Sequence, residues 1–312
     1  MFDTVKGTAS DIREMKIRGA GRIARAGASA MKDFAENYRG GSLEECRKDL
    51  DTAKDILLES RPTAVSLWNG VQACMRDVGN APSGKEATDS VIRNAETFIK
   101  MSSNAVDMIA KIGAKRVSNG DVILTHCNSS AALGVIKEAH AQSKEIKVFA
   151  TESRPWRQGL LTVKELSDAG VDVTLIVDSA VRSVMKRTDI VFVGADTVAS
   201  NGALINKIGT SQLALAADEA RVSFNVCTET YKFSPITLFG DMVTIEERDC
   251  GEVADMEALP KNVKIYNPVF DSTPAKYIDA IITELGVLSP GSVYDVMVRQ
   301  LGDGIFKERD CQ

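Results

Sequence analysis

The hydrophobic pattern of this 312-residue chain changes its period once, near residue 119, and that change constrains the fold more than any other feature. From Asp3 to about Ala114, apolar residues recur at intervals of three and four, as they do along one face of an α-helix. From Asp121 onward, short β-branched runs alternate with helical segments. We therefore predict an all-helical N-terminal domain over residues 1–118 and an α/β domain over residues 119–312.

The second half of the pattern predicts a particular kind of sheet. Six runs have strand character: 121–127, 147–152, 171–178, 189–196, 223–229 and 263–268. Most are apolar on both faces, and helical segments such as 131–142 and 211–221 separate them. Strands of this kind lie in parallel sheets that helices cover on both sides, so we predict a Rossmann-like parallel-sheet domain.

Composition excludes several classes of function. The net charge of -5 argues against a surface for nucleic acid or anionic membrane, and no apolar run approaches the roughly 18 residues of a membrane span. The N-terminus lacks a secretory apolar region, so we expect a cytoplasmic protein. The chain has two histidines and six scattered cysteines without a CxxC pair, from which we expect no metal site. No role follows from the sequence for Cys250 or Cys311.

The carboxyl ends of the predicted strands carry the chemistry, because ligands of open parallel sheets bind there. Cys127 lies at a strand-to-helix turn, with Ser129 and Ser130 as the expected N-caps of the next helix. A helix N-terminus favours the thiolate, so we predict a lowered pKa for a reactive Cys127. The alternative is an inert, buried thiol. His126 precedes it but faces the other way along the strand, which argues against a role as its partner base.

Asp196 ends the otherwise apolar run 189–196. A carboxyl group there is partly desolvated, which raises a carboxyl pKa and suits a general acid. The alternatives are a helix cap or a salt-bridge partner. After it, Asn206 and Lys207 precede Gly209-Thr210, which opens a predicted helix, and we interpret this segment as an anion-binding loop.

Several basic groups stand at turns. Arg154 precedes Pro155 just past a strand end, with Gln158 nearby, and Arg61 precedes Pro62. Arg18 lies beside Gly19, and Gly19 and Gly21 allow the backbone to approach a ligand closely. Each arginine alone is typical of a solvated surface charge, so only their convergence on one ligand would indicate a site.

Taken together, seven collinear motifs resemble those of a known family. They are RGAG (18–21), RPT (61–63), THCNS (125–129), ESRPWRQG (152–159), GADTVASNGALINKIGT (194–210), ETYKF (229–233) and NPVFDSTP (267–274). This set, spanning residues 12 to 290, resembles the archaeal ribose-1,5-bisphosphate isomerases. Their superfamily also contains methylthioribose-1-phosphate isomerase and the alpha, beta and delta regulatory subunits of translation initiation factor 2B.

Two features favour the bisphosphate isomerases within that superfamily. Methylthioribose-1-phosphate isomerases typically carry Pro-Ala where this chain has Gly21-Arg22, and the regulatory subunits generally lack the pair found here as Cys127 and Asp196. Both other members remain alternatives: a non-catalytic regulatory subunit, and an isomerase of methylthioribose 1-phosphate.

The resemblance implies conversion of ribose 1,5-bisphosphate to ribulose 1,5-bisphosphate, in a route from AMP to the substrate of archaeal RuBisCO. It implies that protonated Asp196 assists ring opening and that the Cys127 thiolate removes the C2 proton to give a cis-phosphoenolate, with no cofactor. It also implies a homo-oligomer, a dimer or hexamer. The substrate contacts that it implies are at Arg18, Gly19, Ala20, Gly21, Arg61, Ser129, Ser130, Ala131, Asn206, Lys207 and Lys232, and we add Arg154 and Gln158 from their positions.

Overall fold

A computed structural model describes residues 2–239 and 242–301, so Cys311 lies outside the described residues. The chain divides into two compact units after Ala105, within the long helix α5 (Gly84–Ala114). The domain boundary expected at residue 118 stays a prediction. In the described residues, no helix combines the length and the apolar character that crossing a bilayer requires.

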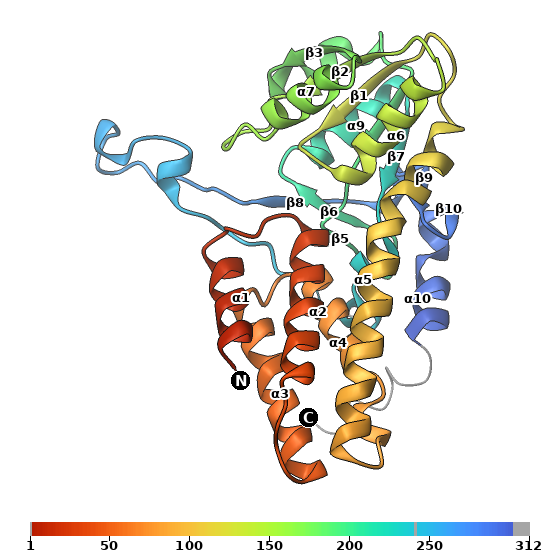
Figure 1. Cartoon of the computed structure of the whole chain (residues 1–312). Coiled ribbons are helices and arrows are strands. Elements are labelled where there is room, and N and C mark those ends of the chain that lie inside the picture. Colours follow the sequence, from red (N-terminus) through yellow and green to blue (C-terminus); the bar gives the residue numbers. More distant parts are fainter. Residues whose placement is uncertain (1, 240–241, 302–312) are drawn as a thin grey trace. The chain divides into compact units, whose positions relative to one another are not determined.

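The first unit is all-helical, as predicted (Figure 1). Beside the first part of α5 it contains α1 (Asp3–Arg13), α2 (Ala20–Glu36), α3 (Leu43–Ser60), α4 (Val65–Met75) and the short 3₁₀ turn η1 (Val78–Asn80). A capping box starts α3, because the Ser42 hydroxyl accepts from the Glu45 N–H while the Glu45 carboxylate accepts from the Ser42 N–H. Phe34, Leu50 and Leu67 are fully buried in its core.

The second unit contains a seven-stranded sheet, and the predicted Rossmann-like architecture is confirmed. Its strands are β1 (Val122–His126), β2 (Lys147–Thr151), β3 (Asp172–Ile176), β4 (Ile190–Val193), β7 (Ser223–Cys227), β9 (Ala280–Thr283) and β10 (Gly286–Leu288), in the order β10-β9-β7-β4-β1-β2-β3. All neighbours are parallel except β9 and β10. The chain runs outward from β1 through β2 to β3 and then returns to β4 on the other side of β1. The β1/β4 boundary is therefore a topological switch point, where such sheets bind ligands.

Both faces of this sheet are covered by helices. Ile123 of β1 belongs to an apolar cluster with the end of α5, α6 (Ser130–Ala141) and Leu166 of α7 (Gly159–Asp168). The next residue, Leu124, belongs to the opposite cluster, with α8 (Val181–Met185), α9 (Thr210–Ala220) and α10 (Val293–Leu301). Successive side chains of a strand point to opposite faces, so this division explains why these strands are continuously apolar.

A second, three-stranded antiparallel sheet was not predicted. It consists of β5 (Thr197–Val198), β6 (Leu204–Lys207) and β8 (Phe270–Thr273), in the order β5-β6-β8. The predicted strand at 263–268 is wrong: this segment has no strand, and Val263 and Tyr266 are 39% and 71% exposed. Its β-branched and aromatic residues have neither a partner strand nor a buried face, and the chain enters β8 only at Phe270.

Short 3₁₀ turns complete the described part of the second unit. They are η2 (Asp178–Ala180), η3 (Thr230–Lys232), η4 (Pro235–Phe239), η5 (Cys250–Glu252), η6 (Met256–Ala258), η7 (Ala275–Tyr277) and η8 (Pro290–Ser292). Two of them, η2 and η3, follow the carboxyl ends of β3 and β7 and carry residues of the candidate site.

Candidate active site

The two predicted catalytic residues follow neighbouring strands of the sheet. Cys127 directly follows β1, and Asp196 lies three residues beyond the end of β4, which pairs with β1 through His126 and Val193. Between these tips, Gly194 lies so close to Ser129 that a Cβ at position 194 would come within 2.3 Å of the Ser129 hydroxyl. A glycine is needed there for the end of β4 to reach the start of α6.

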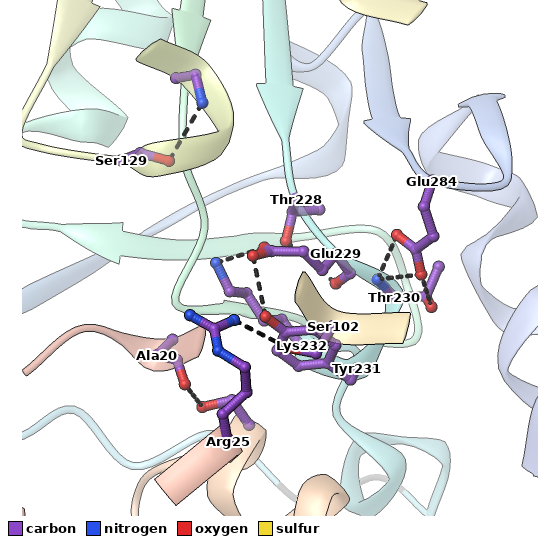
Figure 2. A network of polar contacts seen from close by, with 12 residues as sticks. Ala20, Arg25, Ser102, Ser129, Thr228, Glu229, Thr230, Tyr231, Lys232 and Glu284 are labelled. Atoms are coloured by element: carbon purple, nitrogen blue, oxygen red, sulfur yellow. Dashed lines mark hydrogen bonds and ion pairs between the residues drawn. The ribbon is translucent and has the colours of Figure 1, made fainter. Parts of the chain in front are cut away.

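Cys127 is held at a turn of unusual backbone conformation. Its φ is 65°, in the left-handed region, and its N–H donates to the Ser153 hydroxyl at 2.8 Å. Its thiol donates to the Gln158 side-chain oxygen at 3.4 Å, a contact that the sequence did not indicate, and the predicted role of Gln158 in substrate binding stays a prediction. Ser129 is the N-cap of α6, and its hydroxyl accepts from the Ala132 N–H (Figure 2). Ser130 is the first helical residue, so its predicted role as an N-cap is wrong.

The predicted lowering of the Cys127 pKa is also wrong. Burial raises the pKa of this thiol to about 11, although the positive charge of Lys207 and the Asn128 N–H act in the opposite direction. A helix N-terminus contributes only about 0.3–1 kcal/mol to an anion, which is less than the cost of burying one. The negative charges of Asp196 and Asp178 raise the thiol pKa further, so both carboxyls and Lys207 lie within electrostatic reach of the sulfur.

His126 has no hydrogen bond with the thiol among the described residues and joins two other segments. Its ring is 2% exposed, with Nδ1 2.6 Å from the Thr151 hydroxyl and Nε2 2.9 Å from the Ile208 carbonyl oxygen. A carbonyl only accepts, so Nε2 carries the hydrogen and Nδ1 accepts from Thr151. Burial lowers the pKa of His126 and favours this neutral form. Its role in the structure is to tie β1 and β2 to the turn after Lys207.

Asp196 is half-buried and differs from Cys127 in its surroundings. Its backbone N–H donates to the Ile205 carbonyl at 3.1 Å, which joins it to β6. Among the residues that the structure describes, its carboxyl has no hydrogen-bond or ion-pair partner. The predicted alternatives, a helix cap and a salt-bridge partner, therefore do not describe this residue.

The segment predicted as an anion-binding loop has a different arrangement. Asn206 and Lys207 belong to β6, and Gly209, at φ 101°, precedes α9 as expected. However, the N–H groups of Gly209 and Ser211 donate to the Asp271 carboxylate at 2.8 and 3.1 Å. The anion at this helix start is thus a side chain of β8. Sequence reasoning missed Asp271 because its partners lie about 60 residues earlier in the chain.

Asn206 and Lys207 are neighbours in β6 and have different contacts. The Asn206 amide is buried and donates to the Thr210 hydroxyl at 3.0 Å. The Lys207 ammonium lies 5.3 Å from the centre of the Phe270 ring, and its charge acts on the Cys127 thiol. Lys207 is consequently the cation that the structure associates with the candidate catalytic sulfur.

Lys232 forms a buried ion pair after β7. Its ammonium lies 2.7 Å from the Glu229 carboxylate, and both side chains are less than one-tenth exposed. Figure 2 shows Glu229 between Lys232 and the Tyr231 hydroxyl, which donates to it at 3.0 Å. Burial opposes ionisation of Glu229, but the charge of Lys232 and these hydrogen bonds outweigh it, so the pKa of Glu229 is lowered. Glu284 supports the turn by accepting from the Thr230 N–H at 3.1 Å.

Arg154 contacts the long connection before β8. Its guanidinium donates to the Val253 carbonyl at 2.9 Å and to the Pro155 carbonyl at 3.2 Å, and its backbone N–H donates to Asp178. The structure therefore places its side chain on backbone carbonyls of the second unit. Its role in substrate binding stays a prediction.

The basic motif of the helical unit lies at the start of α2. Gly19 is the N-cap of α2, with φ 87°. No side chain at this position accepts a hydrogen bond from the first N–H groups of the helix. The Ala20 carbonyl accepts from the Ser66 hydroxyl at 3.0 Å, and Arg18 donates through Nε to the Met15 carbonyl at 2.6 Å. Arg61 ends α3 and is half-buried. This helix start has the features of an anion site.

Ser153, Asp178 and Glu229 lie at or just after the ends of predicted strands, and the sequence assigned them no role. A signal for Glu229 was present, because a Glu and a Lys three residues apart after a buried strand can pair. No comparable signal marks Ser153 and Asp178, since their contacts join separate strands.

Comparisons with known proteins agree with this architecture. Residues 16–290 match the model of the initiation factor 2 subunit family. The chain is 53% identical to the ribose 1,5-bisphosphate isomerase of Archaeoglobus fulgidus, over 99% of this chain and 97% of that protein. It is 51% identical to the enzyme of the same name from Methanocaldococcus jannaschii, over 96% of each. The crystal structure of translation initiation factor eIF-2B from Pyrococcus horikoshii OT3 superposes with a TM-score of 0.78 at 33% identity, covering 92% of this chain and 98% of that one.

These comparisons confirm the resemblance that the seven motifs indicated. The match to the family model covers most of the chain, and the two isomerases are similar over nearly its whole length. The chain belongs to the initiation factor 2 subunit family.

Proposed function

We propose that this protein is an isomerase that converts ribose 1,5-bisphosphate to ribulose 1,5-bisphosphate. The observation that carries the proposal is the position of Cys127 and Asp196 just after two adjacent, paired strands at the switch point, in a chain 53% identical to an enzyme of that name. The two isomerases compared above are archaeal, and we propose that this protein acts in the cytoplasm, in a route from AMP toward the substrate of RuBisCO.

The first step is ring opening. The anomeric oxygen of the substrate carries a phosphate, so the furanose cannot open to a free aldehyde without help. Asp196 in its protonated form donates a proton to the ring oxygen, and the bond between C1 and that oxygen breaks. The ring oxygen becomes the C4 hydroxyl and positive charge develops at C1. The Asp196 carboxyl can reorient toward the sugar because it has no protein partner among the described residues.

The second step is proton transfer from C2. The Cys127 thiolate takes the C2 proton, and the electrons of that bond form the double bond between C1 and C2, giving a cis-phosphoenolate. The Cys127 thiol then returns this proton to C1, while the C2 hydroxyl gives its proton to the Asp196 carboxylate and becomes the ketone. Both residues end in their starting forms, so the sequence of steps requires no other reactant.

Lys207 supports the sulfur in this scheme. Its charge lowers the pKa of the Cys127 thiol, against the larger effect of burial. Gln158 accepts the thiol proton in a hydrogen bond and so stabilises the neutral resting form. We propose that the active thiolate is a minor species, formed when the Cys127 thiol loses its proton to solvent, and that it is strongly basic once formed because the thiol pKa is high.

The phosphates require cations and N–H groups. We assign phosphate and sugar contacts to the residues carried over from the family motifs and to Gln158, which contacts Cys127. Those residues are Arg18, Gly19, Ala20, Gly21, Arg61, Ser129, Ser130, Ala131, Asn206, Lys207 and Lys232. The active form is proposed to be a homo-oligomer, a dimer or hexamer.

Turnover of synthetic ribose 1,5-bisphosphate tests this function. Purified protein is expected to form ribulose 1,5-bisphosphate, detected by coupling to RuBisCO, and folded Cys127→Ser and Asp196→Asn proteins are expected to lose this activity. Near-native turnover in both variants would contradict the mechanism. No turnover of any pentose phosphate, together with co-purification with an initiation factor complex, would instead favour the regulatory alternative that the eIF-2B structure suggests. Competition with methylthioribose 1-phosphate tests the remaining alternative.

A further inference from the structure

Cys127 has a backbone conformation that its own residue type does not favour. Its φ of 65° lies in the left-handed region, which residues with a side chain rarely adopt. Such a conformation persists only where surrounding contacts hold it. Two backbone hydrogen bonds do so here: the Cys127 N–H donates to the Ser153 hydroxyl at 2.8 Å, and the Cys127 carbonyl accepts from the Thr162 hydroxyl at 2.6 Å.

Ser153 is itself fixed by its surroundings. It is 1% exposed, and its φ is 58°, so two left-handed residues stand at the tips of the neighbouring strands β1 and β2. Its N–H donates to one oxygen of the Asp178 carboxylate at 2.7 Å, and the Arg154 N–H donates to the other oxygen, also at 2.7 Å. Asp178 starts η2 after β3. One carboxylate therefore fixes the turn after β2, and that turn fixes Cys127.

The hydroxyl of Ser153 is also oriented. The Thr151 hydroxyl donates to the His126 Nδ1, so it accepts at its oxygen from Ser153, 3.2 Å away. The Ser153 oxygen consequently turns its lone pairs toward the Cys127 N–H. The chain of hydrogen bonds runs from Cys127 through Ser153 and Thr151 to His126, and ends on the Ile208 carbonyl beside Lys207.

We propose that Ser153 and Asp178 are positioning residues that hold Cys127 in the orientation needed to take the C2 proton. Neither is assigned a contact with the substrate. The inference rests on the proposed function for its effect on turnover, but its effect on the thiol can be measured without substrate. Without the Ser153 hydroxyl, the turn relaxes from the left-handed region and the half-buried Cys127 side chain moves further toward solvent.

The charged groups that act on the sulfur are Lys207 of β6, Asp196 after β4 and Asp178 after β3. A thiol that moves toward solvent loses part of its burial and part of its interaction with these groups. Its titration should then shift toward that of an ordinary cysteine, and its reaction with an alkylating reagent near pH 8 should become faster. Faster alkylation together with slower turnover distinguishes misplacement of the sulfur from removal of its reactivity.

The experiment compares Ser153→Ala, Ser153→Gly and Asp178→Asn in the full-length protein. Iodoacetamide labelling of the Cys127 peptide is followed by mass spectrometry from pH 6 to 10, and kcat and KM are measured in parallel. We expect at least threefold faster labelling at pH 8, a kcat reduced about 10- to 100-fold, and a KM within about threefold of wild type. Ser179→Ala, next to Asp178 in η2, and Asp172→Asn, at the start of β3, change exposed positions; they are the matched controls and should leave both readouts unchanged.

The buried Cys227 of β7 serves as an internal control for unfolding, since it becomes labelled only if the sheet opens. If the Ser153→Ala protein also exposes Cys227, the Ser153→Gly protein provides the test. Glycine adopts the left-handed conformation without strain, so this variant loses the hydroxyl without adding strain to the turn. The inference would be overturned if the Ser153→Gly and Asp178→Asn proteins both labelled Cys127 at the wild-type rate and both kept a kcat within twofold of wild type. If wild-type protein lacks turnover, the proposed function fails, while the labelling profile still tests the positioning of the thiol.

Discussion

Two carboxyl groups occupy equivalent places on adjacent strands and have opposite surroundings. Val193 of β4 pairs with Val226 of β7, and Asp196 and Glu229 each lie three residues beyond that pair. Glu229 is 3% exposed, ion-paired with Lys232 and bonded by Tyr231. Asp196 is half-buried, and among the described residues its carboxyl has no partner.

This difference distinguishes Glu229, a carboxylate with a structural role, from Asp196, a carboxyl group that is available for chemistry. Lys232 and Tyr231 stabilise the ionised form of Glu229, so its pKa is lowered and it remains an anion throughout the neutral range. A carboxylate of that kind orients a cation but does not give up and recover a proton readily. Asp196 has no such protein partners, which leaves its carboxyl available to the substrate. Environment, and not residue type, assigns the two roles.

The largest effect is expected from Asp196→Asn. The amide cannot donate an acidic proton to the ring oxygen, so kcat should fall by roughly 10³-fold or more. No protein hydrogen bond of the carboxyl is lost, so the free energy of unfolding should change by less than about 0.5 kcal/mol. Steady-state kinetics and urea unfolding measure the two quantities. A large loss of stability would show that Asp196 is a structural carboxylate like Glu229.

Glu229→Gln should give the reverse pattern. Removing one partner of a buried ion pair leaves the other charge unpaired, which costs about 3 kcal/mol of unfolding free energy. The freed Lys232 should raise KM more than it lowers kcat, because Lys232 is proposed to bind substrate and not to transfer a proton. Urea unfolding and steady-state kinetics test both expectations.

A surface ion pair provides the control for Glu229→Gln. Glu219 pairs with Arg182, and their side chains are 57% and 77% exposed, so Glu219→Gln should cost much less unfolding free energy than Glu229→Gln. The double substitution Glu229→Gln, Lys232→Met should recover part of the lost stability, since no unpaired charge remains. Equal costs for Glu229→Gln and Glu219→Gln would contradict the burial argument.

The sequence predicts where both carboxyls lie but not what surrounds them. Residues 189–196 and 223–229 are recognisable because strands buried on both faces leave long apolar runs, and their polar ends mark the edge of the sheet. The sequence is less informative about the residues that contact each carboxyl. Lys232 is close to Glu229 in sequence, but the bond of Asp196 to Ile205 depends on a small sheet that the pattern did not reveal.

The same limit explains the errors. The start of α6 after Cys127 is visible in sequence, but the burial that raises the thiol pKa depends on packing from several elements. The start of α9 is visible too, but its anion is Asp271, from a strand about 60 residues later. Residues 263–268 have strand composition but pair only at their end, through an isolated bridge between Pro268 and Glu247, because pairing depends on residues elsewhere in the chain.

Lowering the pH should remove part of the stability that Glu229 contributes. Its pKa in the folded protein lies below the ordinary value of 4.5, so its contribution is complete above about pH 4.5 and is lost as the pH falls toward the folded pKa. The difference in unfolding free energy between wild type and Glu229→Gln should therefore be constant from pH 7 to 5.5 and smaller at pH 4. Urea unfolding at these pH values measures it, and a difference that grows toward pH 4 would mean that Glu229 is not held as an anion.

The smallest effect is expected from Tyr231→Phe, which removes only the hydroxyl that donates to Glu229 at 3.0 Å. A hydrogen bond to a charged group contributes about 1.5 kcal/mol, and that much unfolding free energy should be lost. Tyr294→Phe is the matched control, because Tyr294 is 49% exposed and the structure gives its hydroxyl no partner among the described residues. In a Glu229→Gln background the cost of Tyr231→Phe should shrink, since a neutral amide accepts a weaker bond than a carboxylate. An undiminished cost there would show that Tyr231 stabilises the fold through other contacts, and that Lys232 alone makes Glu229 different from Asp196.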